Sequence, residues 1–370
     1  MKHYDCIIVG AGPSGLSAAI NLYKEGIKNI CVIDRSTFPR LKACAGYLTD
    51  KTKEMYLDLG VDIEKNNYKK IKGFKLFFKN KQRLHMKNKG LWTNKNIDRK
   101  ELDYALFNVA KKMGIKILEN TEIIKHKINS NKLVLKNKTI KYTNLIFADG
   151  TNGFSFRYQD KKKKKNIALQ ITFEDNKKEA VEIHFGTTKK GYTWVSSTGD
   201  VTNIGFTDVY NKKINYPKLL TEFAKSIGYT INQKEIKSSF VPIKINKNII
   251  MNDNIYFVGD AVGAADPMTL AGVGYALQTG KYAALSIKNN DKNIYLKEIK
   301  TYKRKFSYLY KFMHLFYLKT SLFCILRVAT HFFGSFISYV FDNMFVNNKI
   351  SYKSLLKCIF SYPKNKKYYK

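Results

Sequence analysis

The N-terminal part of the chain alternates between short apolar runs and longer segments with helical spacing. Residues 5–9 and 30–33 are continuous apolar runs, which is typical of parallel strands buried on both faces. Between them, apolar side chains recur at helical spacing from Ser14 to Tyr23, and Gly26 ends that pattern. The opening segment therefore predicts a strand–helix–strand unit.

Related patterns follow later in the chain. Residues 145–150 and 255–261 are apolar runs that end in Asp-Gly and Gly-Asp, and each predicts a buried strand. Helical spacing is found over 102–110 and again after Gly272. Alternating apolar and polar positions, which are typical of an antiparallel sheet, occupy residues 167–173, 180–185, 192–194 and 201–207.

The turn after the first predicted strand has the pattern Gly-x-Gly-x-x-Gly, the fingerprint of a dinucleotide site. Gly10 permits the tight turn, Gly12 lets a pyrophosphate approach the backbone, and Gly15 lets the helix pack on the strand. Ser14 lies at the helix start, and Asp34 ends the second strand, where an acid can accept hydrogen bonds from ribose hydroxyls. A tight turn without a ligand is the alternative, and the fingerprint does not separate NAD from FAD.

The charge of the chain is unusual, with 66 Lys and Arg against 29 Asp and Glu and a net charge of +37. The excess is mostly lysine spread along the chain, which a codon bias explains; an anionic membrane surface is the alternative. We expect no nucleic-acid partner, because no nucleic-acid module has its signature here. The five lysines at 161–165 predict a solvated loop. The apolar fraction of 44% is enough for a sizeable core.

The five cysteines are scattered, odd in number and free of any Cys-x-x-Cys pair. They favour neither a disulfide framework nor a metal site, and together with the lack of a leader-like N-terminus they predict a cytoplasmic protein.

The C-terminal part is rich in aromatic and aliphatic residues, but its longest charge-free stretch, 328–341, is shorter than the roughly 20 residues that span a bilayer. Two interpretations stay open: helices that cap a substrate cavity, or amphipathic helices on the cytoplasmic membrane face, which the lysines at 364–370 favour.

Several further segments carry short motifs. They are Lys-Ala-Cys-Ala-Gly at 42–46, Asp-Arg at 98–99, Asp-Gly at 149–150, Gly-Asp at 259–260, Ala-Gly-Val-Gly at 271–274, and Tyr-Thr-Trp at 192–194 with Gly205 beyond it. Together they resemble the geranylgeranyl reductase family of FAD-dependent oxidoreductases, in the superfamily of para-hydroxybenzoate hydroxylase. The resemblance covers about residues 1–290.

This resemblance implies FAD as the cofactor. Asp260 would bind its ribityl and pyrophosphate portion, and Arg99 would reach it from the opposite side. The helix that starts at Gly272 and Val273 would point its N-terminus at the flavin, where reduced flavin carries negative charge. The other predicted cofactor contacts are Cys44, Ala45, Tyr47 and Ile123. A turn aspartate at 260, a surface ion pair at 99 and a small buried hydrophobe at 44 are the alternatives.

The resemblance also implies a reaction, the reduction of C=C bonds in an isoprenoid or other lipid-like chain. The catalytic candidates are Cys44 and Tyr192 as proton donors, and Tyr192 with Trp194 would contact the substrate, unless both simply pack the core of their sheet. The chain departs from the family at Ser196 and Ser197, where Phe-Pro is expected, so the substrate stays open. A single dinucleotide fingerprint predicts an external reductant, either NAD(P)H or an electron-carrier protein.

Two other functions remain, a flavin-dependent monooxygenase that acts on an apolar compound and a non-enzymatic flavoprotein at a membrane surface. For the architecture we expect an α/β protein (α+β overall). A Rossmann-type FAD-binding domain would comprise 1–165 and 245–290, an inserted antiparallel β-sheet substrate domain 166–244, and a helical C-terminal region 291–370.

Overall fold

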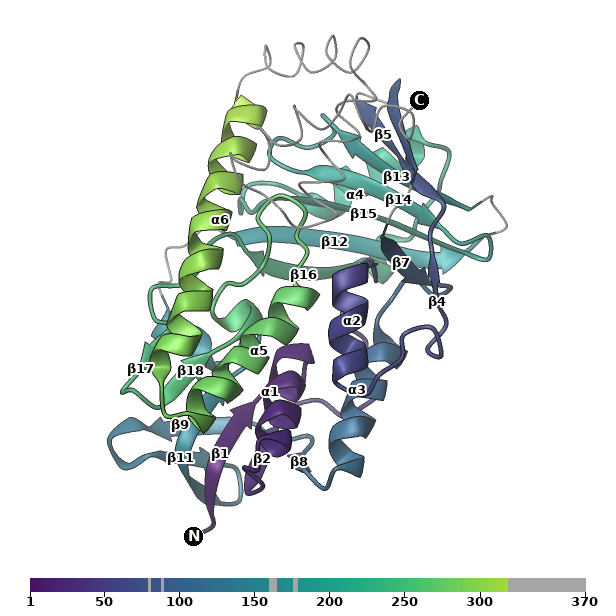
Figure 1. Cartoon of the computed structure of the whole chain (residues 1–370). Helices are drawn as coiled ribbons and strands as arrows, with labels where there is room; N and C mark the ends of the chain where they lie inside the picture. The colour runs from purple at the N-terminus through teal and green to yellow at the C-terminus, as the bar shows by residue number, and fades with distance from the viewer. Residues whose placement is uncertain (79–80, 88–89, 160–164, 176–178, 319–370) are drawn as a thin grey trace, which may run out of the picture.

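A computed structural model describes residues 1–78, 81–87, 90–159, 165–175 and 179–318. It confirms the predicted α/β class: helices pack against a largely parallel sheet at one end of the molecule, and a second, largely antiparallel sheet lies at the other (Figure 1). Most of the lysine run and the whole apolar tail beyond Leu318 lie outside the described residues.

The first sheet contains the predicted strand–helix–strand unit. Its strands are β1 (His3–Val9), β2 (Ile30–Ile33), β8 (Lys116–Leu118), β9 (Ile123–Lys127), β10 (Lys132–Leu135), β11 (Thr139–Phe147), β17 (Ile250–Met251) and β18 (Ile255–Phe257). The order is β17-β18-β11-β1-β2-β8, with β10 and β9 paired beyond β11. The pairs β8–β2, β2–β1, β1–β11 and β11–β18 are parallel. Because the carboxyl ends of these strands meet at one edge, the turns that follow them come together there.

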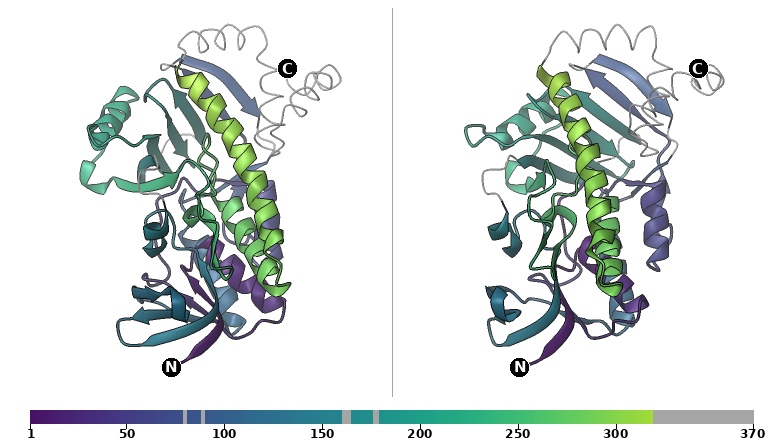
Figure 2. Two further views of the ribbon diagram at one scale, coloured as in Figure 1. Left: turned by 90° about the vertical axis from the view of Figure 1, so that its left-hand side faces the viewer. Right: turned by 60° about the vertical axis from the view of Figure 1, so that its left-hand side comes forward.

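Helices cover this sheet, and they include α1 (Pro13–Lys24), α2 (Asp50–Asp58), α3 (Lys100–Lys112), α5 (Val273–Lys288) and α6 (Lys292–Leu318). The apolar face predicted for α1 is fully buried at Leu16 and Ile20. Helix α5 approaches α1 so closely that a Cβ at Gly280 would overlap the carbonyl of Ser14. Figure 2 shows α6 running lengthwise from the first sheet toward the second.

The second sheet has the order β16-β12-β15-β14-β13-β5-β6. Its strands are β5 (Gly73–Phe78), β6 (Lys81–Lys87), β12 (Lys165–Glu174), β13 (Ala180–Phe185), β14 (Tyr192–Ser197), β15 (Val201–Val209) and β16 (Lys237–Pro242). Helix α4 (Tyr216–Ser226) covers one face, where Leu220 and Phe223 join Val195 and Ile204 in a separate core.

Strands β5 and β6 belong to this sheet although residues 73–87 fall in the range expected for the FAD-binding domain. Strand β5 pairs in parallel with β13, more than a hundred residues away, so the local pattern could not reveal the pairing. The domain boundaries given above stay a prediction. A small third sheet joins β3 (Leu48–Thr49), β7 (Leu91–Asn94) and β4 (Tyr68–Lys70), and short 3-10 turns complete the fold at η1 (Ile128–Ser130), η2 (Phe154–Tyr158), η3 (Gln233–Glu235) and η4 (Gly259–Ala261).

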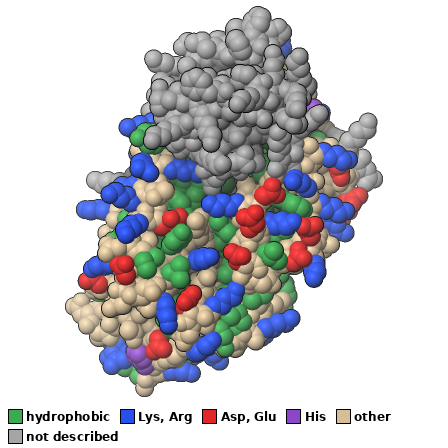
Figure 3. Space-filling view, viewed as in Figure 1, with side chains coloured by type: hydrophobic (Ala, Val, Ile, Leu, Met, Phe, Trp, Pro, Cys, Tyr) green, Lys and Arg blue, Asp and Glu red, His purple; other side chains and the backbone are tan. Residues whose placement is uncertain are grey.

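The basic residues do not gather in one patch on the face that Figure 3 shows; Lys and Arg are spread among acidic and apolar side chains. This distribution is what the solvated-surface interpretation of the net charge predicts for that face. Among the described residues, no helix is both long and apolar enough to cross a membrane.

Candidate cofactor cleft and active site

The glycine turn between β1 and α1 has the conformation that the fingerprint requires. Gly10 has a φ of +106°, and a Cβ there would overlap the carbonyl of Ala148; a Cβ at Gly15 would overlap the carbonyl of Gly10. Gly12 is different, because its φ is −77° and a Cβ there would meet only the Arg40 guanidinium, at 3.5 Å. Gly10 and Gly15 are thus needed by the fold itself, whereas Gly12 leaves open space.

That open space belongs to a cleft of about 760 Å³ between the first sheet and β16. The glycine turn, η4 and the start of α5 converge on it from distant parts of the sequence. Gly259 has a φ of +60°, and a Cβ on it would lie 2.7 Å from the Ser14 hydroxyl oxygen; a Cβ on Gly272 would lie 3.5 Å from Asp260 Oδ1. The volume is within the range of cofactor sites.

Two helices begin at this cleft without a side-chain cap. The N-cap residues are Gly12 for α1 and Gly272 for α5, and neither helix start receives a hydrogen bond from a capping side chain. The first N–H groups of a helix have no intrahelical partners, and here no capping side chain replaces them; the positive ends of both helix dipoles therefore lie open at the cleft. Such ends bind phosphate or another anion, so one cleft offers a diphosphate site and a second site for negative charge.

Asp34 at the end of β2 stabilises the turns that border the cleft. Its Oδ2 accepts a hydrogen bond of 2.7 Å from the Ala11 backbone N–H, and its Oδ1 accepts one of 2.8 Å from the Ser36 backbone N–H. The side chain is nearly buried yet lines the cleft. Each carboxylate oxygen keeps a second acceptor position, which can receive a ribose hydroxyl.

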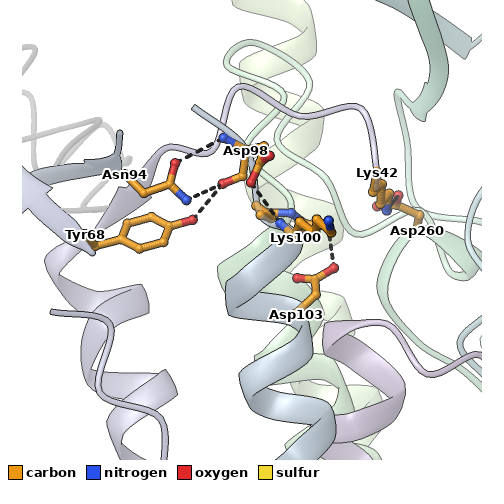
Figure 4. A network of polar contacts seen from close by, with 8 residues as sticks. Lys42, Tyr68, Asn94, Asp98, Lys100, Asp103 and Asp260 are labelled. Atoms are coloured by element: carbon orange, nitrogen blue, oxygen red, sulfur yellow. Dashed lines mark hydrogen bonds and ion pairs between the residues drawn. The ribbon is translucent and has the colours of Figure 1, made fainter. Parts of the chain in front are cut away.

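Residues 39–47, here called the strap, cross from β2 toward the second sheet. The Lys42 Nζ lies 3.5 Å from Asp260 Oδ2, so an ion pair joins the strap to η4 across the cleft (Figure 4). The side chain of Asp260 is mostly buried while that of Lys42 is partly exposed. Asp260 therefore borders the cleft as a carboxylate whose negative charge is already paired with the ammonium group of Lys42.

The strap also contacts the second sheet. The carbonyl of Cys44 accepts a hydrogen bond of 3.4 Å from the Gln170 side chain on β12. The Tyr47 hydroxyl donates to the Ser196 hydroxyl on β14 at 2.6 Å. Ser196 is a position where the family motif has an apolar residue, so the departure noted in the sequence creates a polar contact between the strap and this sheet.

Arg40 is a cleft residue that the sequence analysis did not single out. Its Nε is buried without a hydrogen-bond partner among the described residues, and its guanidinium lies 5.0 Å from the ring of Phe38. It also faces the open side of Gly12. A buried guanidinium donor beside a glycine turn fits a pyrophosphate oxygen. Arg40 lies just before the motif at 42–46, and nothing in the sequence pattern distinguishes it from a solvated arginine.

The turn before α3 is fixed by hydrogen bonds to Asp98. The Tyr68 hydroxyl and the Asn94 side-chain amide both donate to the Asp98 carbonyl, at 3.1 and 3.0 Å, and Asp98 Oδ1 accepts from the Lys100 backbone N–H (Figure 4). These contacts fix the start of α3, and with it the position of Arg99 at the cleft wall.

Arg99 forms a buried ion pair with Asp103, with 3.2 Å between Nη2 and Oδ2. Burial opposes the guanidinium charge, but Asp103, Cys44 and two buried tyrosines outweigh that cost and raise the pKa of Arg99 above its ordinary value. Arg99 is therefore a permanent cation on the wall of the cleft.

Tyr192 and Trp194 lie on β14, outside the wall of the cleft. The Tyr192 hydroxyl donates a hydrogen bond of 2.8 Å to the Thr269 carbonyl in the loop before α5. The indole N–H of Trp194 donates to Asn203 Oδ1 at 2.6 Å, and its ring covers Gly205. Both side chains thus have packing roles, and the structure does not bring them to the cofactor cleft.

Most of the predicted cofactor contacts do line the cleft: Gly10, Gly12, Ser14, Asp34, Cys44, Arg99, Ile123, Asp260, Gly272 and Val273. The others, Gly15, Ala45 and Tyr47, lie outside its wall. Residues 238–241 of β16 also form the wall, which sequence reasoning missed because their place depends on the long-range pairing of β16 with β12. The cleft, the two uncapped helix starts and the buried Nε of Arg40 fit an FAD molecule.

Comparison with known proteins agrees with this geometry. The sequence profile described as "FAD binding domain" matches residues 3–284. An uncharacterized protein of Methanosarcina barkeri is 28% identical over 301 residues, 79% of this chain and 76% of that protein. Digeranylgeranylglycerophospholipid reductase 3 of Methanosphaera stadtmanae is 27% identical over 79% of this chain and 80% of its own length. The crystal structure of a geranylgeranyl bacteriochlorophyll reductase-like protein from Thermoplasma acidophilum superposes with a TM-score of 0.74 at 20% identity, covering 97% and 96% of the two chains.

Proposed function

Because this chain belongs to the FAD binding domain family, we propose that it is an FAD-dependent reductase of C=C bonds in an isoprenoid lipid. The family confirms FAD as the cofactor and confirms the oxidoreductase class that the sequence predicts. The relatives named as digeranylgeranylglycerophospholipid reductases confirm the resemblance to the geranylgeranyl reductase family. The substrate class is our proposal, and it is supported by those names and by the Lys-x-Cys segment at the cleft.

The residues of the cleft have distinct roles in this proposal. Gly12 and Arg40 would hold the pyrophosphate, Asp34 the adenosine ribose, and Asp260 the ribityl chain. The uncapped start of α5 at Gly272 would stabilise negative charge on the flavin. When bound and reduced, FAD supplies the hydride for the alkene.

The protein itself must supply the proton that completes the reduction. An isolated alkene has no carbonyl that could stabilise developing charge, so the acid has to be held close to the carbon it protonates. Cys44 lines the cleft, and its backbone is held by Gln170. Tyr192 already donates its hydroxyl proton to the Thr269 carbonyl and lies outside the cleft wall. We therefore assign the acid to Cys44 in preference to Tyr192.

The observation that carries the proposal is the convergence of the glycine turn, Asp260 and the start of α5 on one cleft that also contains Cys44. The test is mass spectrometry of lipids from cells with and without the protein. We expect isoprenoid species whose masses rise in steps of two hydrogens only when the protein is present. Identical lipid profiles, obtained with FAD-loaded protein in the cells, would contradict the proposed substrate class.

A flavin-dependent monooxygenase is the second candidate, and the FAD fold alone supports it. It requires oxygen as a co-substrate, whereas the proposed reductase does not. Turnover under isotopically labelled oxygen separates the two, because only a monooxygenase incorporates the label into its product. Since the single dinucleotide fingerprint serves FAD, we also propose an external reductant, either NAD(P)H or an electron-carrier protein.

A non-enzymatic flavoprotein at a membrane surface is the third candidate. Its support comes from the sequence, from the net charge of +37 and from the apolar C-terminal part with its lysines at 364–370; most of the lysine run at 161–165 and the tail beyond Leu318 lie outside the described residues. It predicts co-sedimentation with anionic vesicles and no turnover of any isoprenoid substrate. We propose membrane attachment only as an addition to the enzyme, where it would bring the cleft to a lipid substrate.

A further inference from the structure

Near the cleft lies a cluster of buried polar side chains from three elements. Arg99 and Asp103 come from α3, Tyr56 from α2 and Tyr68 from β4, and each is at most 4% exposed. All four lie close enough to interact electrostatically with one another, and Arg99, Tyr56 and Tyr68 interact with Cys44 as well. The cluster is far from the glycine turn in sequence, and of its four members Arg99 lines the cleft whereas Asp103, Tyr56 and Tyr68 do not.

Three atoms in this cluster have no hydrogen-bond partner among the described residues: Arg99 Nε, Asp103 Oδ1 and Tyr56 Oη. The ion pair uses Arg99 Nη2 and Asp103 Oδ2, so the guanidinium still has an unpaired buried donor. An unpaired donor on a buried cation is costly unless an acceptor comes near it. Arg99 and Cys44 both line the cleft, and the strap approaches the start of α3 there, because a Cβ at Gly46 would lie 2.9 Å from the Asp98 carbonyl oxygen.

We propose that Arg99 is the counter-charge of Cys44 and that Asp103 is the positioning residue that holds Arg99 in place for this task. The inference rests on the proposed role of Cys44 as proton donor. In that step the thiol S–H bond breaks and a C–H bond forms on the substrate, which leaves a negative charge on sulfur. Arg99 balances this charge until solvent returns a proton to the thiolate.

The charged and polar groups around Cys44 determine the direction in which each substitution should change the stability of its thiolate. Arg99 is the cation on the α3 side and Asp103 is the anion that opposes it, while Tyr56 and Tyr68 stay neutral because burial raises the pKa of both. On the strap itself, Lys42 is already paired with Asp260. Removal of the cation must therefore disfavour a thiolate, and removal of the anion must favour it.

The test is the rate at which iodoacetamide alkylates Cys44 in the full-length, FAD-loaded protein at neutral pH, with the modified peptide identified by mass spectrometry. Only the thiolate reacts, so the rate reports the charge balance at sulfur. We expect Arg99→Gln to slow alkylation by about tenfold and Asp103→Asn to accelerate it. Lys100→Gln is the matched control: it removes an exposed charge from the neighbouring position of α3 and should change the rate by less than about twofold.

Opposite signs for the two variants would not arise from loosened packing, which exposes the thiol and accelerates both. Equal directions, or an Arg99→Gln rate equal to that of the unmodified protein, overturn the inference. Removing one partner of a buried pair is strongly destabilising, so the double variant Arg99→Met with Asp103→Leu replaces the pair by apolar side chains. Because it removes a cation and an anion together, its alkylation rate should lie between those of the two single variants, and a rate outside that range would contradict the proposal.

This readout is independent of the substrate. If lipid analysis reveals no reduced isoprenoid while the two variants still act in opposite directions, the proposed function fails and the counter-charge stands. If isoprenoid lipids are reduced but the alkylation rates of the two variants do not change, the proposed function stands and the counter-charge role of Arg99 fails.

Discussion

Gly205 lies directly against the indole of Trp194: a Cβ at position 205 would overlap ring atoms of that tryptophan. The two residues face each other in the antiparallel pair of β14 and β15, and the indole N–H is held by Asn203 on the same strand as Gly205. The spacing of Trp and Gly in the family motif therefore has a physical reason. The glycine provides space for the indole on the strand opposite it.

We expect Gly205→Ala to destabilise the protein by about 1–3 kcal/mol, the usual cost of overpacking a buried site. Urea unfolding at constant protein concentration measures the change. The double variant Trp194→Phe with Gly205→Ala is the control, because a smaller ring should recover part of the loss if the two side chains compete for one space. Additive losses in the double variant would show that the overlap is not the cause.

Gly12 and Gly10 should respond differently to the same substitution. A Cβ at Gly12 has room, and the backbone there is accessible to alanine, so Gly12→Ala should leave the free energy of unfolding of the FAD-free protein unchanged while FAD retention falls. Gly10→Ala should reduce stability itself, because its φ is positive and the Ala148 carbonyl occupies the space. Flavin absorbance of the purified protein and urea unfolding of the FAD-free form measure the two effects.

If Gly12→Ala retained full flavin, or lost stability as Gly10→Ala does, the pyrophosphate would not lie where we place it. Asp260→Ala and Gly12→Val are two further variants of the FAD site, and both should give colourless protein because they should not retain FAD. The unchanged protein should be yellow.

The stability of the fold should depend on pH through His126. Its ring nitrogens pair with the hydroxyls of Tyr158 and Tyr142, at 2.8 and 2.6 Å. Burial, followed by the nearby Arg157, lowers the pKa of His126 from 6.5 to about 4. The unfolded chain therefore binds the proton first as the pH falls, and stability present above pH 6.5 is lost on the way to about pH 4.

Because His126 is only partly buried, we expect this loss to be about 1–2 kcal/mol once solvent screening is allowed for. His126→Gln keeps hydrogen-bonding capacity but does not titrate, so its stability should vary less over the same window. Urea unfolding at several pH values between 7 and 4 makes the comparison. A variant that follows the same curve as the unmodified protein would assign the acid sensitivity to other groups.

Local sequence patterns predicted the strands and helices that build the cleft. They predicted less well the contacts between residues that are far apart in the sequence. The runs at Ile30–Ile33 and Ala180–Phe185 are strands with those bounds, because apolar and alternating patterns report burial directly. The strand predicted over 255–261 ends at Phe257, because Gly259 takes a positive φ and η4 follows. That departure places Asp260 at the cleft, a position that no strand would have given it.

The contacts of the strap could not be read from the sequence. Tyr47 meets Ser196, and Lys42 meets Asp260, across separations that depend on how the two sheets are placed. The same holds for the strands at 73–87, which complete the second sheet from outside the expected domain range. Motif reasoning identifies which segments form the site, whereas tertiary packing decides which side chains in them reach it.

The choice between Cys44 and Tyr192 as the proton donor gives the last prediction. Removing a general acid typically lowers the rate by a factor of about 10²–10⁴. We expect Cys44→Ala to do this to single-turnover alkene reduction, with FAD retained and KM little changed, because the thiol would act on the reaction and not on binding. Tyr192→Phe removes a hydroxyl that is bonded to the Thr269 carbonyl, so it should cost stability while the rate stays within about threefold. Cys44→Ser retains a much weaker acid in the same place and should be slow as well. A fast Cys44→Ala variant together with a slow Tyr192→Phe variant would move the proton donor to β14, and Cys44 would then be a packing residue of the strap.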